Sequence, residues 1–126
     1  MERQFISSGT PWEPVVGERA VRVGNVVHES GTTTTRADGT LAGPESAYEQ
    51  AAQALKHIDA ALREASASMA VVRTRMYATD MSRWEEFARA HGEVFGTIRP
   101  ATTMVEVRRL ISPDMLIEIE AEAVVA

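Results

Sequence analysis

The sequence contains no cysteine in its 126 residues, which excludes disulfides, thiolate catalysis and thiolate metal sites. It also lacks an excess of positive charge, because 13 basic residues are outnumbered by 18 acidic ones and the formal net charge is −5. Proteins that bind nucleic acid usually rely on a surplus of lysine and arginine. We therefore expect no nucleic-acid partner.

Long apolar runs are missing as well. No segment approaches the uninterrupted apolar length that spans a bilayer, and residues 1–8 show no apolar stretch after a basic start. We therefore expect no membrane partner and a cytoplasmic location. The three histidines and the many carboxylates show no ligand spacing of the His-Glu-x-x-His kind, so we expect no metal.

What is present fits one ordinary globular domain. With 44% hydrophobic and 25% charged residues, a chain of 126 residues can bury one sizeable core. We expect a single domain over residues 1–126. No internal repeat or low-complexity tract interrupts it.

The first half of the chain predicts a hairpin, a loop and a long helix. Residues 20–23 and 26–29 flank Gly24-Asn25, a pair suited to the positive φ values of a tight turn. Residues 31–43 are rich in Thr and Gly without periodicity, which indicates a surface loop of the kind that often borders a site. Pro44 suits a first helical turn, and apolar residues then recur at helical spacing to about Ala65.

The second half predicts a strand, a helix and two more strands. Residues 70–79 alternate as a strand does, and Ser82 with Glu85 has the spacing of a capping box at a helix start. We expect that helix to end at Gly96, and we expect strands over 102–110 and 116–125. The apolar side of the helix is expected to consist of Trp84, Ala88, His91 and Phe95, with His91 as a hydrogen-bonded core residue.

This order of elements predicts an α+β fold with a single sheet and two helices on one face. Because side chains alternate along a strand, the apolar residues of 117–123 point to the helices and Glu118, Glu120 and Glu122 point away from them. The same argument gives a polar face, expected to carry Arg73, Arg75, Tyr77, the three glutamates, Thr102, Met104, Glu106 and Arg108. Such a face is either solvated or a polar subunit interface.

Several motifs together resemble the Rid family, also called YjgF or L-PSP proteins. They are Arg22-Val-Gly-Asn-Val-Val27, Ser30-Gly31, Arg73-Thr-Arg-Met-Tyr77, Arg99-Pro-Ala-Thr102 and Ile117-Glu-Ile-Glu-Ala121. The resemblance covers roughly residue 19 to the end of the chain. It rests on the order and spacing of these motifs.

The resemblance implies a chorismate-mutase-like subunit that forms a homotrimer with small-molecule clefts between subunits. It implies hydrolysis of reactive enamines and imines, made by pyridoxal-phosphate enzymes, to a keto acid and ammonia, with no metal or organic cofactor. By alignment, Glu118 takes the place of the catalytic acid, and Ser30, next to Gly31, matches a serine that lines the cleft. Met104, Arg75 and His28, which shares strand parity with Ser30, are further substrate-binding candidates.

Two departures from the family pattern bear on the substrate. The family's imine deaminases carry arginine after Pro-Ala, as a bidentate clamp for the substrate carboxylate, whereas this chain has Thr102 there. The tyrosine that precedes the second strand in those enzymes would fall near Gly17 or Glu18, so an aromatic wall is expected to be missing. We therefore expect a substrate without the usual α-carboxylate.

Other readings of the same residues stay open. Glu118 is either catalytic or half of an ion pair with Arg73 or Arg75, and Ser30 is either a cleft residue or a turn residue that satisfies backbone groups. The protein itself is either a deaminase-like hydrolase or a non-catalytic ligand-binding or interaction protein on the same scaffold. A ribonuclease activity, suggested by the names of some relatives, is disfavoured by the acidic charge.

Overall fold

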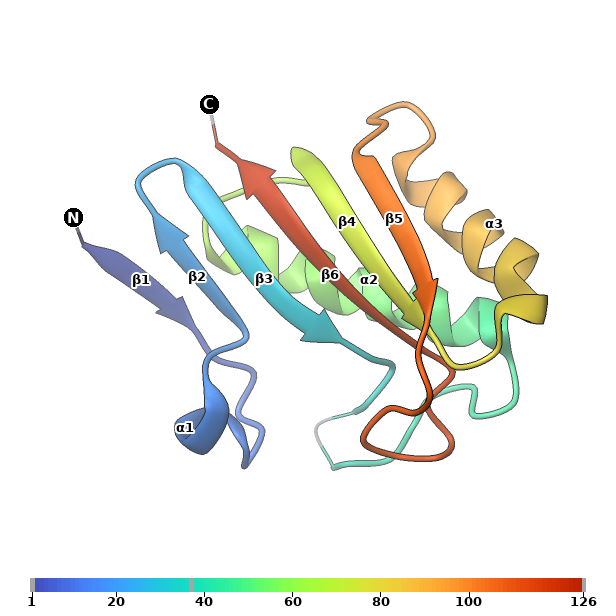
Figure 1. Ribbon diagram of the computed structural model, residues 1–126. Helices are drawn as coiled ribbons and strands as arrows, with labels where there is room; N and C mark the ends of the chain where they lie inside the picture. Colours follow the sequence, from blue (N-terminus) through green and yellow to red (C-terminus); the bar gives the residue numbers. More distant parts are fainter. Residues whose placement is uncertain (1, 37, 126) are drawn as a thin grey trace.

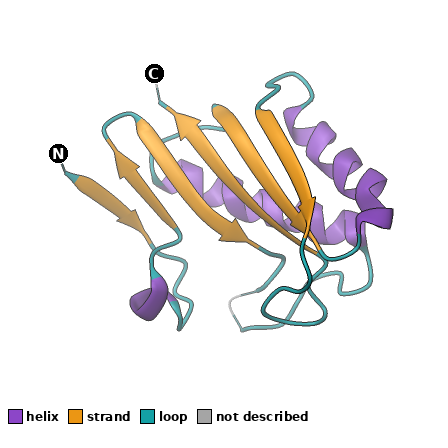
Figure 2. Cartoon of the chain, viewed as in Figure 1, coloured by secondary structure: helices purple, strands orange, loops and turns teal. Residues whose placement is uncertain are grey.

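The computed structural model describes residues 2–36 and 38–125. They form one six-stranded sheet with two long helices on one face, which confirms the predicted α+β fold (Figures 1 and 2). The elements in chain order are β1 (Arg3–Ile6), α1 (Glu13–Val16), β2 (Ala20–Val23), β3 (Val26–Thr32), α2 (Ala47–Glu64), β4 (Val71–Ala78), the 3-10 turn η1 (Met81–Arg83), α3 (Trp84–Phe95), β5 (Ala101–Glu106) and β6 (Ile117–Val124).

The strand order across the sheet is β1-β2-β3-β6-β4-β5. The predicted hairpin is confirmed: β2 and β3 pair antiparallel around Gly24, whose φ of 61° suits the tight turn. The last strand, β6, lies in the middle of the sheet between β3 and β4, and β5 pairs with β4 in parallel. Strand β1 and the one-turn helix α1 were not predicted, because four residues are too few to show a period.

The core lies between the sheet and the helices. Val27, Met76 and Ile119 on the strands pack with Leu55 and Ile58 on α2, and all five are fully buried. Helix α2 begins at Ala47, three residues later than predicted, because the side chain of Ser46 accepts a hydrogen bond from the backbone N–H of Glu49 and caps the first turn. No helix in the described part of the chain is both long and apolar enough to cross a membrane.

The predicted start of the second helix was wrong. Asp80, rather than Ser82, caps the chain here: it accepts hydrogen bonds from Ser82 and opens η1, and α3 follows from Trp84 without a side-chain cap. The buried side of α3 also differs in part from the prediction, although Phe95 is buried as expected. Trp84 is half exposed, whereas Phe87 and Ala90 are buried.

The faces predicted for the penultimate strand were also wrong. Strand β5 ends at Glu106, and its parallel register places Thr102 opposite Thr74 and Met104 opposite Met76. Thr74 and Met76 are both buried against the helices. Thr102 Oγ1 lies 2.8 Å from Thr74 Oγ1, which in turn lies 2.9 Å from the Nε2 atom of His91 on α3. His91 is thus hydrogen-bonded, as predicted.

Thr102 and Met104 therefore lie on the helix side of the sheet, and so does Glu106, which accepts a hydrogen bond from the backbone N–H of Met81 in η1. Arg108 lies beyond the end of β5. The face of an edge strand depends on where its pairing begins, and that register is not visible in the alternation of its own residues.

Candidate active site: a cleft around Glu118

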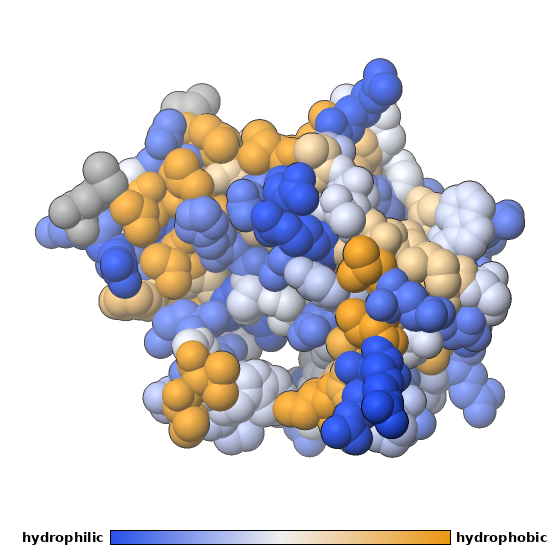
Figure 3. All heavy atoms as spheres, viewed as in Figure 1, coloured by the Kyte–Doolittle hydropathy of each residue, from blue (hydrophilic) through white to orange (hydrophobic). Residues whose placement is uncertain are grey.

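A cavity of about 590 Å³ lies beside the end of β3 and the beginning of β6. Figure 3 shows a hollow there, between α1 and the loop that joins β5 to β6, on the side opposite the helices. Residues from four separate segments converge on it. They include Trp12, Ser30, Gly31, Ile111, Met115 and Glu118.

Glu118 is the acid of this cleft. It lies on β6 opposite Tyr77 and points away from the core, since Ile117 and Ile119 on either side are fully buried. Its partial burial raises the pKa of the carboxyl above its ordinary value, and the negative charge of Glu120 adds to this rise, while Arg19 opposes it. Among the residues described, the Glu118 carboxyl has no hydrogen bond or ion pair.

The neighbouring glutamates are paired instead. Arg75 Nη1 lies 3.1 Å from Glu122 Oε1 and 3.4 Å from Glu120 Oε1, and the hydroxyl of Tyr77 donates to Glu120 at 2.7 Å. Within this chain, therefore, the reading of Glu118 as the ion-pair partner of Arg75 was wrong. Glu118 thus differs from Glu120 and Glu122, which lie on the same face, because those two carboxylates are paired and its own is not.

Gly31 allows Glu118 to reach this position. A Cβ atom at residue 31 would lie 2.7 Å from both Cδ and Oε1 of Glu118, closer than atoms approach without moving. The backbone of β3 thus forms the floor beneath the carboxyl. Any side chain larger than hydrogen would displace that carboxyl.

Ser30 has both of the roles considered from the sequence. Its hydroxyl donates to the backbone carbonyl of Arg19 at 2.9 Å, and its own N–H donates to the same oxygen at 2.8 Å. It also lines the cleft beside Gly31. The hydrogen bonds fix the segment before β2 against the end of β3, which shapes the cleft wall.

The other sequence candidates lie elsewhere. His28 and Arg75 line a separate hollow of about 310 Å³ on the polar face, with Glu120 and Glu122. Thr102 and Met104 lie on the helix side of the sheet. The described chain therefore brings together Glu118, Ser30 and Gly31 in one cleft but leaves the other four candidates outside it.

The apolar rim of the cleft was not predicted from the sequence. Trp12, which precedes α1, lines the cavity and is 41% exposed, and Ile111 in the β5–β6 loop is 84% exposed. An aromatic wall was expected to be missing, because none stands near Gly17 or Glu18, but Trp12 gives the cleft an aromatic side chain from another position. No periodic signal could have found it, because it lies in an irregular segment before a four-residue helix.

A buried acid stands behind the cleft. Glu29 on β3 is 4% exposed, and its carboxyl lies 2.6 Å from the hydroxyl of Thr32, which accepts a hydrogen bond from Arg19 at 2.7 Å. Burial raises the pKa of Glu29 to about 8, although Thr32 and Arg19 act in the opposite direction. The protonated form of Glu29 therefore predominates at pH 7, and in that form it does not offset the positive charge of Arg19.

No cluster of three or more histidine or carboxylate side chains that could hold a metal ion occurs in residues 2–36 and 38–125. Glu13 of α1, which lines the cleft, is instead engaged by hydroxyls: Ser7 and Ser8 donate to its carboxylate. Burial opposes ionisation of Glu13, but these hydrogen bonds outweigh it and lower its pKa to about 2.

Comparisons with known proteins agree with this architecture. The sequence profile of the family described as "Endoribonuclease L-PSP" matches residues 15–125. An uncharacterized protein of Streptomyces coelicolor is 35% identical over 120 residues, which cover 94% of this chain and 89% of that protein. A RutC family protein of Pyrococcus abyssi is 33% identical over 106 residues, 83% of each chain.

Solved structures show the same fold. A member of the YjgF/YER057c/UK114 family from Mycobacterium tuberculosis superposes with a TM-score of 0.89 at 45% identity, covering 98% of this chain and all of that one. YyfA of Yersinia pestis, a protein of the Rid family, superposes with a TM-score of 0.87 at 28% identity, covering 98% and 100% of the two chains.

Proposed function

The chain belongs to the YjgF/Rid/L-PSP family, and from this premise we propose that it hydrolyses small imines or enamines in the cleft around Glu118. The observation that carries the proposal is the state of Glu118. It is the one glutamate of the β6 series without a partner in the described chain, its pKa is raised, and it faces a cavity rather than open solvent.

A carboxyl in this state suits both proton transfers of the reaction. Water adds to the imine carbon, and the C=N double bond becomes a C–N single bond in a carbinolamine. Glu118 in its acid form gives a proton to the nitrogen, and its carboxylate form takes one from the attacking water. Collapse of the carbinolamine then forms the carbonyl and releases ammonia. No electrons are exchanged, so the reaction needs no redox cofactor.

The substrate in this proposal lacks the usual α-carboxylate. Thr102 is neutral, and its hydroxyl is already hydrogen-bonded to Thr74 and to the carbonyl of Pro100. The rim residues Trp12 and Ile111 favour an apolar substituent on the imine carbon. A neutral imine with an aliphatic or aromatic substituent fits these features best.

A homotrimer is part of the proposal. Among the described residues β5 is an edge strand of the sheet. Thr102 and Met104 lie apart from Glu118 within the chain, so in this proposal they contribute to a cleft from a neighbouring subunit. The side chains of Arg75, Glu120 and Glu122 on the polar face are only partly buried within the chain, so they are accessible to a neighbouring subunit.

A matched pair of substrates tests the proposal. The imine of isoamylamine and the 2-imino acid of leucine differ only in the carboxylate, and each is generated freshly by an amine oxidase or an amino-acid oxidase. We expect the protein to speed ammonia release from the first more than from the second, and Glu118→Gln to abolish the effect. If no imine is turned over but the ligands bind, the protein is a non-catalytic ligand-binding member of the family.

A further inference from the structure

The segment between β1 and β2, residues 7–19, forms an arm that carries one wall of the cleft. It leaves the sheet after β1, contains the one-turn helix α1 and returns at Arg19, directly before β2 (Figure 1). Trp12 and Val16 of this arm line the cleft around Glu118. The position of the arm therefore sets the shape of the cleft on this side.

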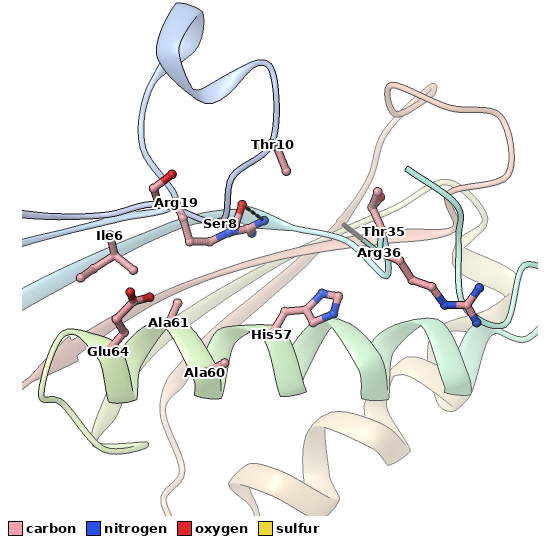
Figure 4. Close-up of a pocket in the computed structure, with 11 residues that line it drawn as sticks. Ile6, Ser8, Thr10, Arg19, Thr35, Arg36, His57, Ala60, Ala61 and Glu64 are labelled. Atoms are coloured by element: carbon pink, nitrogen blue, oxygen red, sulfur yellow. Dashed lines mark hydrogen bonds between the residues drawn. The ribbon is translucent and has the colours of Figure 1, made fainter. Parts of the chain in front are cut away.

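Apolar packing does not hold the arm in place. Within residues 7–19, Glu13 is the only buried residue, whereas Val15 and Val16 are 84% and 82% exposed. A second cavity, of about 270 Å³, lies between the arm and α2, and Arg19 lines both this cavity and the cleft (Figure 4). The arm is thus bordered by two cavities, and its attachment depends on polar contacts.

Arg19 makes these polar contacts. Its Nη2 atom donates to the hydroxyl of Ser8, within the arm, at 3.3 Å, and its Nη1 atom donates to the hydroxyl of Thr32 on β3 at 2.7 Å. Figure 4 shows the guanidinium turned toward Ser8. In the described part of the chain, every hydrogen bond between residues 7–19 and another segment is made by Arg19, either by this side chain or by its backbone carbonyl, which accepts from Ser30.

The partners at both ends of this contact are themselves held. On β3, Thr32 is fully buried, and its hydroxyl donates to the carboxyl of Glu29 at 2.6 Å. In the arm, the N–H of Ser8 donates to the carboxylate of Glu13 at 2.9 Å, and the Ser8 hydroxyl donates to it as well. A continuous series of hydrogen bonds therefore leads from the inside of the sheet to the residue that follows Trp12.

We propose that Arg19 is a positioning residue that holds Trp12 over the cleft and thereby sets the preference of the cleft for apolar substituents. A guanidinium suits this role because its planar fork binds two acceptors in fixed directions, here one on β3 and one in the arm. A lysine has a single ammonium on a flexible stem and does not reproduce this geometry. The substrate preference rests on the proposed imine hydrolysis, whereas the position of Trp12 does not.

Fluorescence of Trp12 tests the positioning without any assay of turnover. The only other tryptophan, Trp84 on α3, is replaced with phenylalanine in all the proteins compared. We expect acrylamide quenching of Trp12 to rise in Arg19→Gln and in Arg19→Lys toward the value of free tryptophan, because Trp12 is 41% exposed in the attached arm. The matched control Arg36→Gln, which removes a side chain that donates to Thr40, should leave the quenching unchanged.

Substrate preference tests the consequence for the cleft. The imine of ethylamine lacks the branched end of the imine of isoamylamine, so the ratio of kcat/KM for the two imines measures contact with the apolar wall. One methylene in an apolar pocket changes kcat/KM by about tenfold or more, so both Arg19 variants should lower this ratio by about tenfold and Arg36→Gln should not. Burial raises the pKa of Glu118 and the charge of Arg19 opposes this rise, so Arg19→Lys, which keeps the charge, separates positioning from an effect on the acid.

Unchanged quenching of Trp12 in Arg19→Gln would overturn the inference. An equal loss of kcat/KM toward both imines, or a full preference in Arg19→Lys, would overturn it as well, because Arg19 would then act through its charge. Stronger quenching of Trp12 in both variants, with no turnover of any imine by the wild type, would refute the proposed hydrolysis and support the positioning of Trp12 by Arg19.

Discussion

Replacing Gly31 with alanine is the sharpest perturbation of the proposed active site. The new methyl group would lie 2.7 Å from Cδ and Oε1 of Glu118 and 3.0 Å from its Cγ. Favourable contact between such atoms begins at about 3.5 Å, so the carboxyl has to move by roughly 0.8 Å or rotate out of its position. The backbone can keep its conformation, because Gly31 is not in the left-handed region.

The expected effect is large on catalysis and small on stability. A displacement of about 1 Å in a catalytic group costs on the order of 100-fold in rate, or about 2.7 kcal/mol in the activation barrier. The free energy of unfolding should change by less than about 1 kcal/mol, because the obstacle is the end of a flexible side chain. Gly31→Ala should therefore separate activity from folding.

The assay is kcat for ammonia release from the isoamylamine imine, with the urea unfolding midpoint measured on the same preparations. Gly92→Ala is the matched control, since nothing lies within 4 Å of a Cβ at that position in α3. It should keep wild-type activity and raise the stability by about 0.8–1 kcal/mol through helix propensity. A Gly31→Ala protein with wild-type kcat would refute the placement of the reacting carboxyl at Glu118.

Three further predictions concern other parts of the molecule. Between pH 4.5 and 8 the folded state keeps a proton on Glu29 that the unfolded chain releases, so the free energy of unfolding falls as the pH rises, by up to about 1.4 kcal/mol per pH unit. Glu29→Gln should flatten this dependence when urea unfolding is measured at pH 5 and pH 8, and an unchanged slope would contradict the prediction. Gln50→Leu should lower the free energy of unfolding by about 2–4 kcal/mol, because the fully buried amide accepts a hydrogen bond from the Leu116 N–H at 2.9 Å and donates to two carbonyls. Thermal unfolding measures this loss, and a loss below about 0.5 kcal/mol would argue against it. Thr102→Arg should raise turnover of 2-imino acids relative to neutral imines, and an unchanged preference would show that residue 102 does not set the substrate class.

The strands and helices with a clear period were predictable from the sequence. The alternation of Ile117, Glu118 and Ile119 gave the correct face of β6, because a strand in the middle of a sheet has one side on the core along its whole length. The burial of Glu29 on β3 was not predictable in the same way. Glu29 lies two residues after the buried Val27, on the same face of the strand, and it is buried too, although glutamate is a residue type that is usually exposed.

The site was only partly predictable, for two physical reasons. Glu118, Ser30 and Gly31 belong to motifs of the family, and they do meet in one cleft. Thr102 was assigned to the wrong face because the parallel register of β5 on β4 depends on tertiary pairing. Trp12 was missed because irregular segments carry no pattern that reveals what they cover.

The catalytic role of Glu118 is tested by the rate of ammonia release from freshly generated imines with the wild type and with Glu118→Gln, measured alongside the oligomeric state. We expect clear acceleration by the wild type and none by Glu118→Gln, with the same assembly and the same ligand affinity in both. Equal turnover by the two proteins would contradict a catalytic Glu118. A loss of assembly in the variant would show that Glu118 is an interface residue instead.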